Sequence, residues 1–292
     1  MKLLITKLFL ILLCFTHHAW SYDYNLSICA IFRDEAPYLK EWIEFHRLVG
    51  VEHFWLYNNN SQDEYLSILE PYVNDGTVSM LDWPTDPDDN ETLFQMEAFN
   101  HCVSKVRYCT KWLAVIGIDE FIVPVKNNSI TEILAPFEQI PNVGGIKVHP
   151  QYFGTSNLWL IPDNKTLIES LTQKALWDHP ANQKTKTICR PERVQKFWSN
   201  NAAYYPPFVA VTQNGKTGSQ QPIQIEPLRI HHYWTRHEKY FFGTKIPRKE
   251  KGEQREYSFE EIHRIIDDFD RTYDPTILRY VPALRKKMGF DS

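Results

Sequence analysis

The sequence lacks several features that would assign it to large classes of proteins. Its 292 residues contain no long run of Lys and Arg, and the formal net charge is −4 with both signs interspersed. Nucleic acid is therefore not an expected partner, because binding its backbone requires concentrated positive charge. The sequence also shows no internal repeat and no low-complexity linker, which argues against a repeat protein or a disordered chain.

Dense metal-binding motifs are missing as well. No C-x-x-C pair and no H-E-x-x-H segment occurs, so neither a zinc–thiolate site nor a metal-dependent hydrolase is indicated. Only five cysteines are present, and Cys14 lies in the N-terminal leader. The other four allow three pairings. Cys102 and Cys109 flank the end of a predicted helix and are the expected disulfide partners.

The chain has no apolar run of the roughly 20 residues that a membrane-spanning helix needs. Residues 1–21 begin with a basic segment, continue with the apolar stretch Leu8–Phe15, and end with Ala19 and Ser21. This pattern is typical of a secretory signal peptide. The alternative is a short uncleaved anchor, which would be the only membrane attachment. We expect an exported protein, in the Golgi or ER lumen of a eukaryote, or periplasmic or secreted in a bacterium.

The chain does contain an alternation of apolar strands and amphipathic helices. The predicted strands are 26–32, 51–57, 76–83 and 111–118, and the predicted helices are 33–50, 65–72 and 91–106. Asp34 is placed to cap the first helix. This order predicts an α/β fold with right-handed crossovers and a mainly parallel sheet. We expect a single domain over residues 22–255, with a C-terminal helical extension over residues 256–292 that packs on it.

Polar residues follow three of the predicted strands. Arg33 and Asp34 follow the first strand, a loop containing Asp63 follows the second, and Asp119 and Glu120 follow the fourth. Ligands of such sheets bind at the carboxyl ends of the strands. The sequence therefore predicts that these side chains converge on one rim and form a binding site.

The longer motifs resemble glycosyltransferase family 92. The resemblance rests on ICAIFRDEAPYLKEWIEFHRLVGVEHFWLYNNNSQD, then WLAVIGIDEFIVP, then HHYWTRHEKYF, in an order that runs from about Leu26 to Lys245. It implies a GT-A fold, which is a Rossmann-type, mainly parallel sheet flanked by helices. It further implies a metal-dependent, inverting hexosyltransferase that moves a sugar from a nucleotide sugar to a glycan hydroxyl. A UDP-linked donor, with galactose as one candidate sugar, is what the resemblance suggests.

The same resemblance assigns a metal site. Asp119 corresponds to the last acid of a D-x-D motif and is the expected ligand of Mn²⁺ or Mg²⁺, which prefer carboxylate oxygens. His232 is expected to complete the metal shell or to bind a phosphate. The first acid of the motif is replaced by Gly117. Two alternatives follow: a working transferase, in which Gly117→Asp should strengthen nucleotide binding, or a catalytically weakened member that acts as a glycan-binding module.

Other residues are expected to contact the donor. We expect Glu120 to orient the loop or to meet the sugar, because neighbouring residues of a strand point to opposite faces. The guanidinium of Arg236 suits a diphosphate. The remaining expected donor contacts are Arg33, Asp34, Asp63 and Lys245.

The acceptor side is defined less well by the sequence. Inverting transfer needs a carboxylate as general base within hydrogen-bond reach of the acceptor hydroxyl. Glu169, Asp178 and Glu192 are alternatives for this role. Trp159, Trp177 and Trp198 are candidates for a wall on which acceptor sugars stack, although any single Trp can equally belong to the core.

Overall fold

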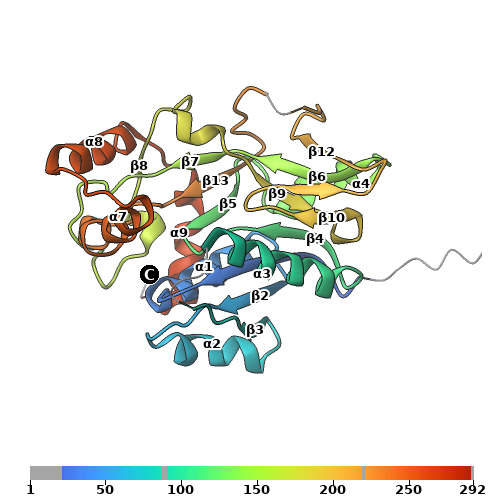
Figure 1. Cartoon of the computed structure of the whole chain (residues 1–292), viewed down its shortest axis with the longest axis horizontal. Helices are drawn as coiled ribbons and strands as arrows, with labels where there is room; N and C mark the ends of the chain where they lie inside the picture. Colours follow the sequence, from blue (N-terminus) through green and yellow to red (C-terminus); the bar gives the residue numbers. More distant parts are fainter. Residues whose placement is uncertain (1–21, 87–90, 219–220, 291–292) are drawn as a thin grey trace, which may run out of the picture.

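A seven-stranded sheet forms the centre of the molecule, with the strand order β12-β6-β9-β4-β1-β2-β3 (Figure 1). The computed structural model describes residues 22–86, 91–218 and 221–290. The predicted leader, residues 1–21, lies outside the described residues. Six strands of this sheet point in one direction, and only β9 is antiparallel to its neighbours. The strands are β1 (Tyr24–Phe32), β2 (His53–Asn58), β3 (Val78–Asp82), β4 (Thr110–Val115), β6 (Val143–Val148), β9 (Lys186–Cys189) and β12 (Val209–Thr212).

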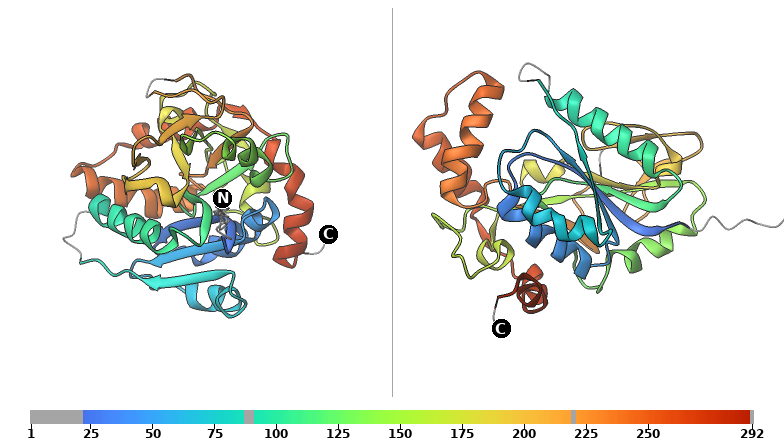
Figure 2. Two further views of the ribbon diagram at one scale, coloured as in Figure 1. Left: turned by 90° about the vertical axis from the view of Figure 1, so that its right-hand side faces the viewer. Right: turned by 90° about the horizontal axis from the view of Figure 1, so that it is seen from below.

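Helices cover both faces of this sheet. Figure 2 shows α3 (Glu91–Val106) on one face, and α1 (Ala36–Leu48) and α2 (Tyr65–Asn74) on the other. Alternate residues of β1 serve the two sides: Ile28 packs in the larger core cluster and Cys29 in the cluster beneath α3. This double burial explains the nearly continuous apolar runs in the sequence. The predicted α/β class with a mainly parallel sheet is confirmed.

The predicted Cys102–Cys109 disulfide is wrong, because all four cysteines of the described residues are free. Cys102 lies on the buried side of α3, in the same cluster as Cys29 and Cys189. Cys109 lies beyond the end of the helix, half-buried, with its Sγ 3.6 Å from the carbonyl oxygen of Val106. The first thiol is therefore fully buried in this cluster, and the second is partly buried against it.

A second sheet connects the centre of the molecule to its C-terminal part. It has three strands in the order β5-β13-β7, which are β5 (Glu120–Pro124), β13 (Leu228–His232) and β7 (Pro150–Tyr152). His232 is paired with Glu120 on one side and with Tyr152 on the other. Segments that are distant in sequence thus meet at the turn that follows β4.

The C-terminal elements surround this small sheet. The helices α7 and α8 lie at one side of it, and α9 packs along α1 (Figure 1). Lys40 of α1 donates to the carbonyl oxygen of Met288 at 3.1 Å, and a buried ion pair of 2.7 Å joins Arg229 to Asp274. The elements are α6 (Glu238–Tyr240), a π-helical turn (Phe241–Lys245), α7 (Ile246–Glu253), α8 (Phe259–Phe269), β14 (Thr272–Tyr273), a 3₁₀ turn (Thr276–Tyr280) and α9 (Val281–Met288). The boundary at residue 255 stays a prediction.

The remaining elements are short, apart from the helix α4, which packs on the larger core cluster. They are α4 (Ile130–Glu138), α5 (Leu167–Ser170), β8 (Gln173–Lys174), β10 (Val194–Phe197), β11 (Ala202–Tyr204) and two 3₁₀ turns (Pro180–Gln183 and Pro191–Arg193). Along the three described ranges, no helix combines the length and the apolarity that crossing a membrane requires.

Candidate active site

The loops after β1 and β2 are tied together at the start of α1. Asp34 does not cap this helix as predicted, because Glu35 occupies the N-cap position. The carboxylate of Asp63 instead accepts the N–H of Ala36 at 2.7 Å. Asp34 adopts a positive φ of 56°, and its carboxylate accepts the N–H of Gln62 at 2.8 Å. The two loops are thereby joined at the rim where the site was predicted.

Helix α1 also fixes the strand that carries the acids. The indole N–H of Trp42 donates to the carbonyl oxygen of Glu120 at 2.8 Å. One turn later, His46 Nε2 accepts the N–H of Ile122 at 3.1 Å, and its Nδ1 lies 2.8 Å from the carbonyl oxygen of Trp42. This pattern requires the neutral ring with its proton on Nδ1. The E-W-I-x-x-H segment of the sequence is therefore a clamp on β5.

Protonation of His46 is expected to destabilise the protein at acid pH. Burial lowers the pKa of His46 from 6.5 to about 3. Below about pH 6.5 the unfolded chain binds this proton and the folded chain does not, so stability is complete above this pH and falls towards pH 3. The slope from this group is about 1.4 kcal/mol per pH unit. Urea denaturation across this pH range measures it.

His46→Gln provides the matched variant for that experiment. Its amide oxygen can accept the N–H of Ile122 but does not titrate, so its stability should vary less with pH than that of the wild type. His263→Gln, at a partly exposed histidine of α8, should keep the wild-type pH dependence. A parallel loss of stability in the wild type and in His46→Gln would show that His46 is not the responsible group.

Asp119 lies at the centre of a cluster of charged side chains. It is in the turn between β4 and β5, and its Oδ2 lies 3.4 Å from His232 Nε2 and 3.5 Å from Lys245 Nζ. Burial opposes ionisation of Asp119, but the adjacent positive charges of His232 and Lys245 outweigh it and hold the pKa well below its usual range. Asp119 is therefore an anion with two basic contacts.

Glu120 is oriented by the loop that precedes it. Its Oε2 accepts the N–H of Gly117 at 2.7 Å and pairs with Lys186 Nζ at 3.0 Å. Its Oε1 lies 3.5 Å from His232 Nδ1 and has no hydrogen-bond partner. The His232 ring thus lies between Asp119 and Glu120, and the ring of Tyr152 packs on it at a centroid distance of 4.4 Å.

Arg236 is held rigidly beside these acids. Its Nη2 pairs with Glu35 Oε2 at 2.5 Å. Its guanidinium lies 3.7 Å from the ring centroid of Tyr38 and 4.5 Å from that of Tyr240. Burial disfavours the charged form, but the carboxylate of Glu35 outweighs it and raises the pKa of Arg236. Its Nη1 is buried without a partner, so the side chain retains hydrogen-bonding capacity for an anion.

The predicted nucleoside contacts lie on the neighbouring loops. Arg33 donates to the carbonyl oxygen of Asn59 at 2.9 Å and to Thr85 Oγ1 at 3.1 Å. Asp63 Oδ1 is buried without a partner. Arg248 of α7 reaches Asp34 at 3.9 Å. The loops after β1 and β2 and the helix α7 therefore meet at one edge.

The space beside Gly117 is filled by the side chain of Asp119. A Cβ at this position would lie 2.6 Å from Asp119 Oδ1 and 3.6 Å from Glu120 Oε2. Any side chain would force Asp119 to move, and Asp119 is the expected metal ligand. The structure therefore argues against the expectation that Gly117→Asp strengthens nucleotide binding.

Asp119 and His232 fit a divalent metal ion. Their facing atoms are 3.4 Å apart, close to the roughly 3 Å between neighbouring ligands of an octahedral ion with bonds of about 2.1 Å. Among the described residues, no group of three or more His, Cys, Asp and Glu side chains could hold a metal. The pair therefore suits an ion that takes its other ligands from water and from nucleotide phosphates, as Mg²⁺ does.

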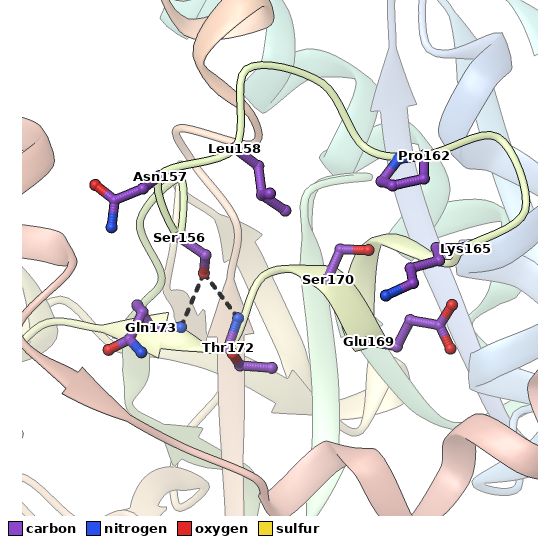
Figure 3. A pocket seen from close by; sticks show the side chains of 9 residues that line it. All are labelled: Ser156, Asn157, Leu158, Pro162, Lys165, Glu169, Ser170, Thr172 and Gln173. Atoms are coloured by element: carbon purple, nitrogen blue, oxygen red, sulfur yellow. Dashed lines mark hydrogen bonds between the residues drawn. The ribbon is translucent and has the colours of Figure 1, made fainter.

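The three general-base candidates have different surroundings. Glu169 forms the capping box of α5 with Thr166 and pairs with Arg285 at 2.8 Å. It lines a pocket of about 290 Å³ (Figure 3), whose lining residues are Ser156, Asn157, Leu158, Pro162, Lys165, Glu169, Ser170, Thr172 and Gln173. Glu192 pairs with Arg190 at 2.9 Å and with Arg193 at 3.4 Å. Asp178 is exposed in a turn. The role of general base stays a prediction.

The three tryptophans predicted to bind the acceptor lie at the surface, whereas the histidine beside His232 is in the core. Trp159, Trp177 and Trp198 are 60%, 56% and 47% exposed, so their rings remain accessible for stacking. His231 is fully buried, stacks on Phe153 at 4.3 Å and accepts a hydrogen bond from an arginine. His231 is thus a packed neighbour of His232.

Sequence reasoning missed several members of the cluster. Glu35 stands in the R-x-E segment, so its motif could have identified it, whereas Tyr38 and Tyr240 acquire significance only by stacking on Arg236. Lys186 lies on β9 of the large sheet and pairs at 3.0 Å with Glu120 on β5 of the second sheet. No local pattern in the sequence indicates that contact.

Comparison with known proteins gives a consistent family assignment. The family model of glycosyltransferase family 92 matches residues 22–273. A glycosyltransferase family 92 protein of Oryza sativa subsp. japonica is 27% identical over 170 residues, which are 58% of this chain and 27% of the relative. The matches span 27–31% of the length of this and other plant relatives.

Three relatives carry more specific names, and two of them are described here. A beta-1,4-galactosyltransferase of Caenorhabditis elegans is 23% identical over 256 residues, which are 84% of this chain and 56% of the relative. A galactan beta-1,4-galactosyltransferase of Arabidopsis thaliana is 30% identical over 126 residues, which are 40% of this chain and 25% of the relative. The solved structure of S. aureus TarS 1-349 with UDP covers 57% of this chain and 47% of its own, at 14% identity and a TM-score of 0.37.

Proposed function

Because the chain belongs to glycosyltransferase family 92, and is therefore a glycosyltransferase, we propose that it moves a sugar from a UDP-linked donor to a glycan hydroxyl with inversion. The observation that carries this proposal is the cluster at the carboxyl end of β4. There, Asp119 faces His232 and Lys245 within 3.5 Å, beside an arginine with an unpaired buried nitrogen. Such a cluster suits a diphosphate leaving group.

Each side chain of the cluster has a defined task in this proposal. Asp119 and His232 hold Mn²⁺ or Mg²⁺, which when bound neutralises charge on the departing nucleoside diphosphate. Arg236, fixed by Glu35 and two tyrosines, supplies a preorganised donor to the same phosphates. Glu120 keeps the Asp119 turn in place through the N–H of Gly117.

The nucleoside end of the donor is assigned to the neighbouring loops. Asp63 Oδ1, which is buried without a partner, can accept a hydrogen bond from the ribose or the base. Arg33 and Asp34 complete this edge, because they fix the loops after β2 and contact α7. The missing first acid of the D-x-D motif is thereby replaced by groups from other strands.

UDP-galactose is the proposed donor, because two relatives are named as beta-1,4-galactosyltransferases. A carboxylate among Glu169, Asp178 and Glu192 is the proposed general base for the acceptor hydroxyl. The exposed Trp159, Trp177 and Trp198 are the proposed acceptor-stacking surface.

The exported or secretory location proposed from residues 1–21 is consistent with a glycan acceptor. In a eukaryote, the Golgi or ER lumen would be its site of action.

Calorimetric titration of UDP and UDP-sugars, with and without Mn²⁺, tests the proposal. The wild type should bind UDP more tightly with Mn²⁺, and UDP-galactose should bind best among the sugars. Gly117→Asp should weaken this binding by about tenfold or more, since its side chain displaces Asp119. Gly76→Asp is the matched control, because a Cβ at Gly76 meets nothing within 4 Å, although its positive φ lowers stability.

This titration, together with an assay of UDP release in the presence of acceptors, separates the two alternatives. Binding of UDP-galactose without any turnover, with a range of glycan acceptors, would favour the glycan-binding alternative. A folded wild type that binds no UDP-sugar under any condition would overturn the proposed donor. Tighter binding by Gly117→Asp would show that the missing acid, and not the packing of the turn, limits the site.

A further inference from the structure

Lys245 contacts the same oxygen that the metal needs. Its Nζ lies 3.5 Å from Asp119 Oδ2, on the atom that also faces His232 Nε2. The ammonium group is additionally 5.1 Å from the ring centroid of Trp234, so two contacts hold it in place. Lys245 is the last residue of the π-helical turn Phe241–Lys245, a rare geometry that is frequent at functional sites.

Each acid of the cluster already has a basic partner without a metal. The acids are Glu35, Asp119 and Glu120, and each is paired with a basic side chain: Arg236, Lys245 and Lys186 respectively. A divalent cation at Asp119 would add two positive charges beside the ammonium group of Lys245. Like charges at this separation repel strongly where water is scarce. A diphosphate brings the negative charge that compensates both cations.

We propose that Lys245 excludes a divalent cation from Asp119 in the nucleotide-free protein and moves to the phosphates when a nucleoside diphosphate binds. This inference rests on the proposed function and extends it to the order of binding. Lys245 then makes the affinities for metal and nucleotide depend on each other. By thermodynamic linkage, UDP must strengthen Mn²⁺ binding by the same factor by which Mn²⁺ strengthens UDP binding.

Mn²⁺ binding measured by electron paramagnetic resonance, with and without UDP, tests this directly and needs no turnover. The wild type should bind free Mn²⁺ weakly, and saturating UDP should tighten it by at least about tenfold. Lys245→Met should bind Mn²⁺ alone about tenfold more tightly than the wild type, because Asp119 Oδ2 becomes available. In EDTA it should bind UDP more weakly, because one phosphate contact is lost. The coupling factor is the ratio of the Mn²⁺ affinities with and without UDP. It should fall in this variant, because Mn²⁺ alone already binds more tightly.

Two further variants keep the test specific. Lys245→Arg retains the positive charge and should keep the wild-type coupling. If Lys245 acted only through the packing of its aliphatic stem, the charge would not matter and this result would not be expected. Lys251→Met changes an exposed lysine of α7 and should leave both affinities unchanged. Near-ultraviolet circular dichroism checks folding, and Lys245→Gln replaces Lys245→Met if the latter does not fold.

The outcomes distinguish this inference from the proposed function. If UDP recruits Mn²⁺ to the wild type, but Lys245→Met binds free Mn²⁺ no more tightly, the exclusion by Lys245 is wrong and the proposed function stands. If UDP binds the wild type equally well in EDTA and in Mn²⁺, the coupling is absent and the inference is overturned. If the wild type binds no UDP at all, both proposals fail.

Discussion

Replacing Asp119 by asparagine is expected to lower kcat/KM for sugar transfer by about a hundred- to thousandfold, the usual effect of removing one preorganised charged group from a transition state. Asparagine keeps the shape of the side chain but removes the anion that faces His232 and Lys245. In the proposed function, both the metal and the orientation of the diphosphate depend on that charge. Release of UDP from the donor identified by titration measures the rate.

The control for this loss is Asp268→Asn, on the exposed face of α8, where Asp268 makes only a long surface pair of 4.0 Å. Its activity and stability should equal those of the wild type, because such pairs contribute little. Asp119→Asn should remain folded, because the asparagine fills the same space. Its two basic neighbours, His232 and Lys245, each lose a single ion-pair contact. Transfer at the wild-type rate by a folded Asp119→Asn would remove Asp119 from the mechanism.

Glu35→Gln is expected to lower the free energy of unfolding by about 3 kcal/mol, and the melting temperature by roughly 6 °C or more. The guanidinium of Arg236 is only 1% exposed and its charge is balanced by Glu35 at 2.5 Å. The neutral amide leaves that charge buried without compensation, and burial of an unpaired charge is costly. Thermal unfolding followed by circular dichroism measures the loss.

Glu226→Gln is the matched control for Glu35→Gln. It also removes one carboxylate from an ion pair, but Lys126 and Glu226 are 76% and 47% exposed, so the change should stay below about 1 kcal/mol. The double variant Glu35→Gln with Arg236→Met should recover part of the lost stability, because it removes the unpaired charge. If Glu35→Gln and the wild type were equally stable, the prediction would be wrong, and water would have to solvate the charge of Arg236 in place of Glu35.

The sequence predicted the sheet and the location of the rim well, because both depend on local patterns. Apolar runs and helical periodicity gave β1, α1, β2 and α3 close to their observed bounds. The direction of the strands then followed from their alternation with helices. The strand predicted at 111–118 was too long: β4 ends at Val115, because the chain turns at Gly117 to place Asp119 beside His232.

Partners were predicted less well than positions. Cys102 and Cys109 are close in sequence, but both thiols are free, with Cys102 buried in the cluster beneath α3 and Cys109 partly buried against it. Asp34 has the right type for a cap, yet its backbone adopts a positive φ and Glu35 takes the cap position. Glu169 had a sequence position compatible with a general base, and tertiary contacts gave it a helix cap and an ion pair with Arg285.

The sequence by itself determined an α/β chain of glycosyltransferase family 92. It also predicted Asp119 and Glu120 at the end of a strand, and His232 as their partner from a later segment. Those features rest on residue order, periodicity and motif, which are properties of the linear chain. Only the tertiary structure decided that Lys245 and His232 face the same oxygen of Asp119, that Arg236 is paired with Glu35, and that a side chain at Gly117 would meet Asp119 Oδ1. These depend on distances between side chains that folding brings together, and the pairing of β5 with β13 places His232 opposite Glu120 and so beside Asp119.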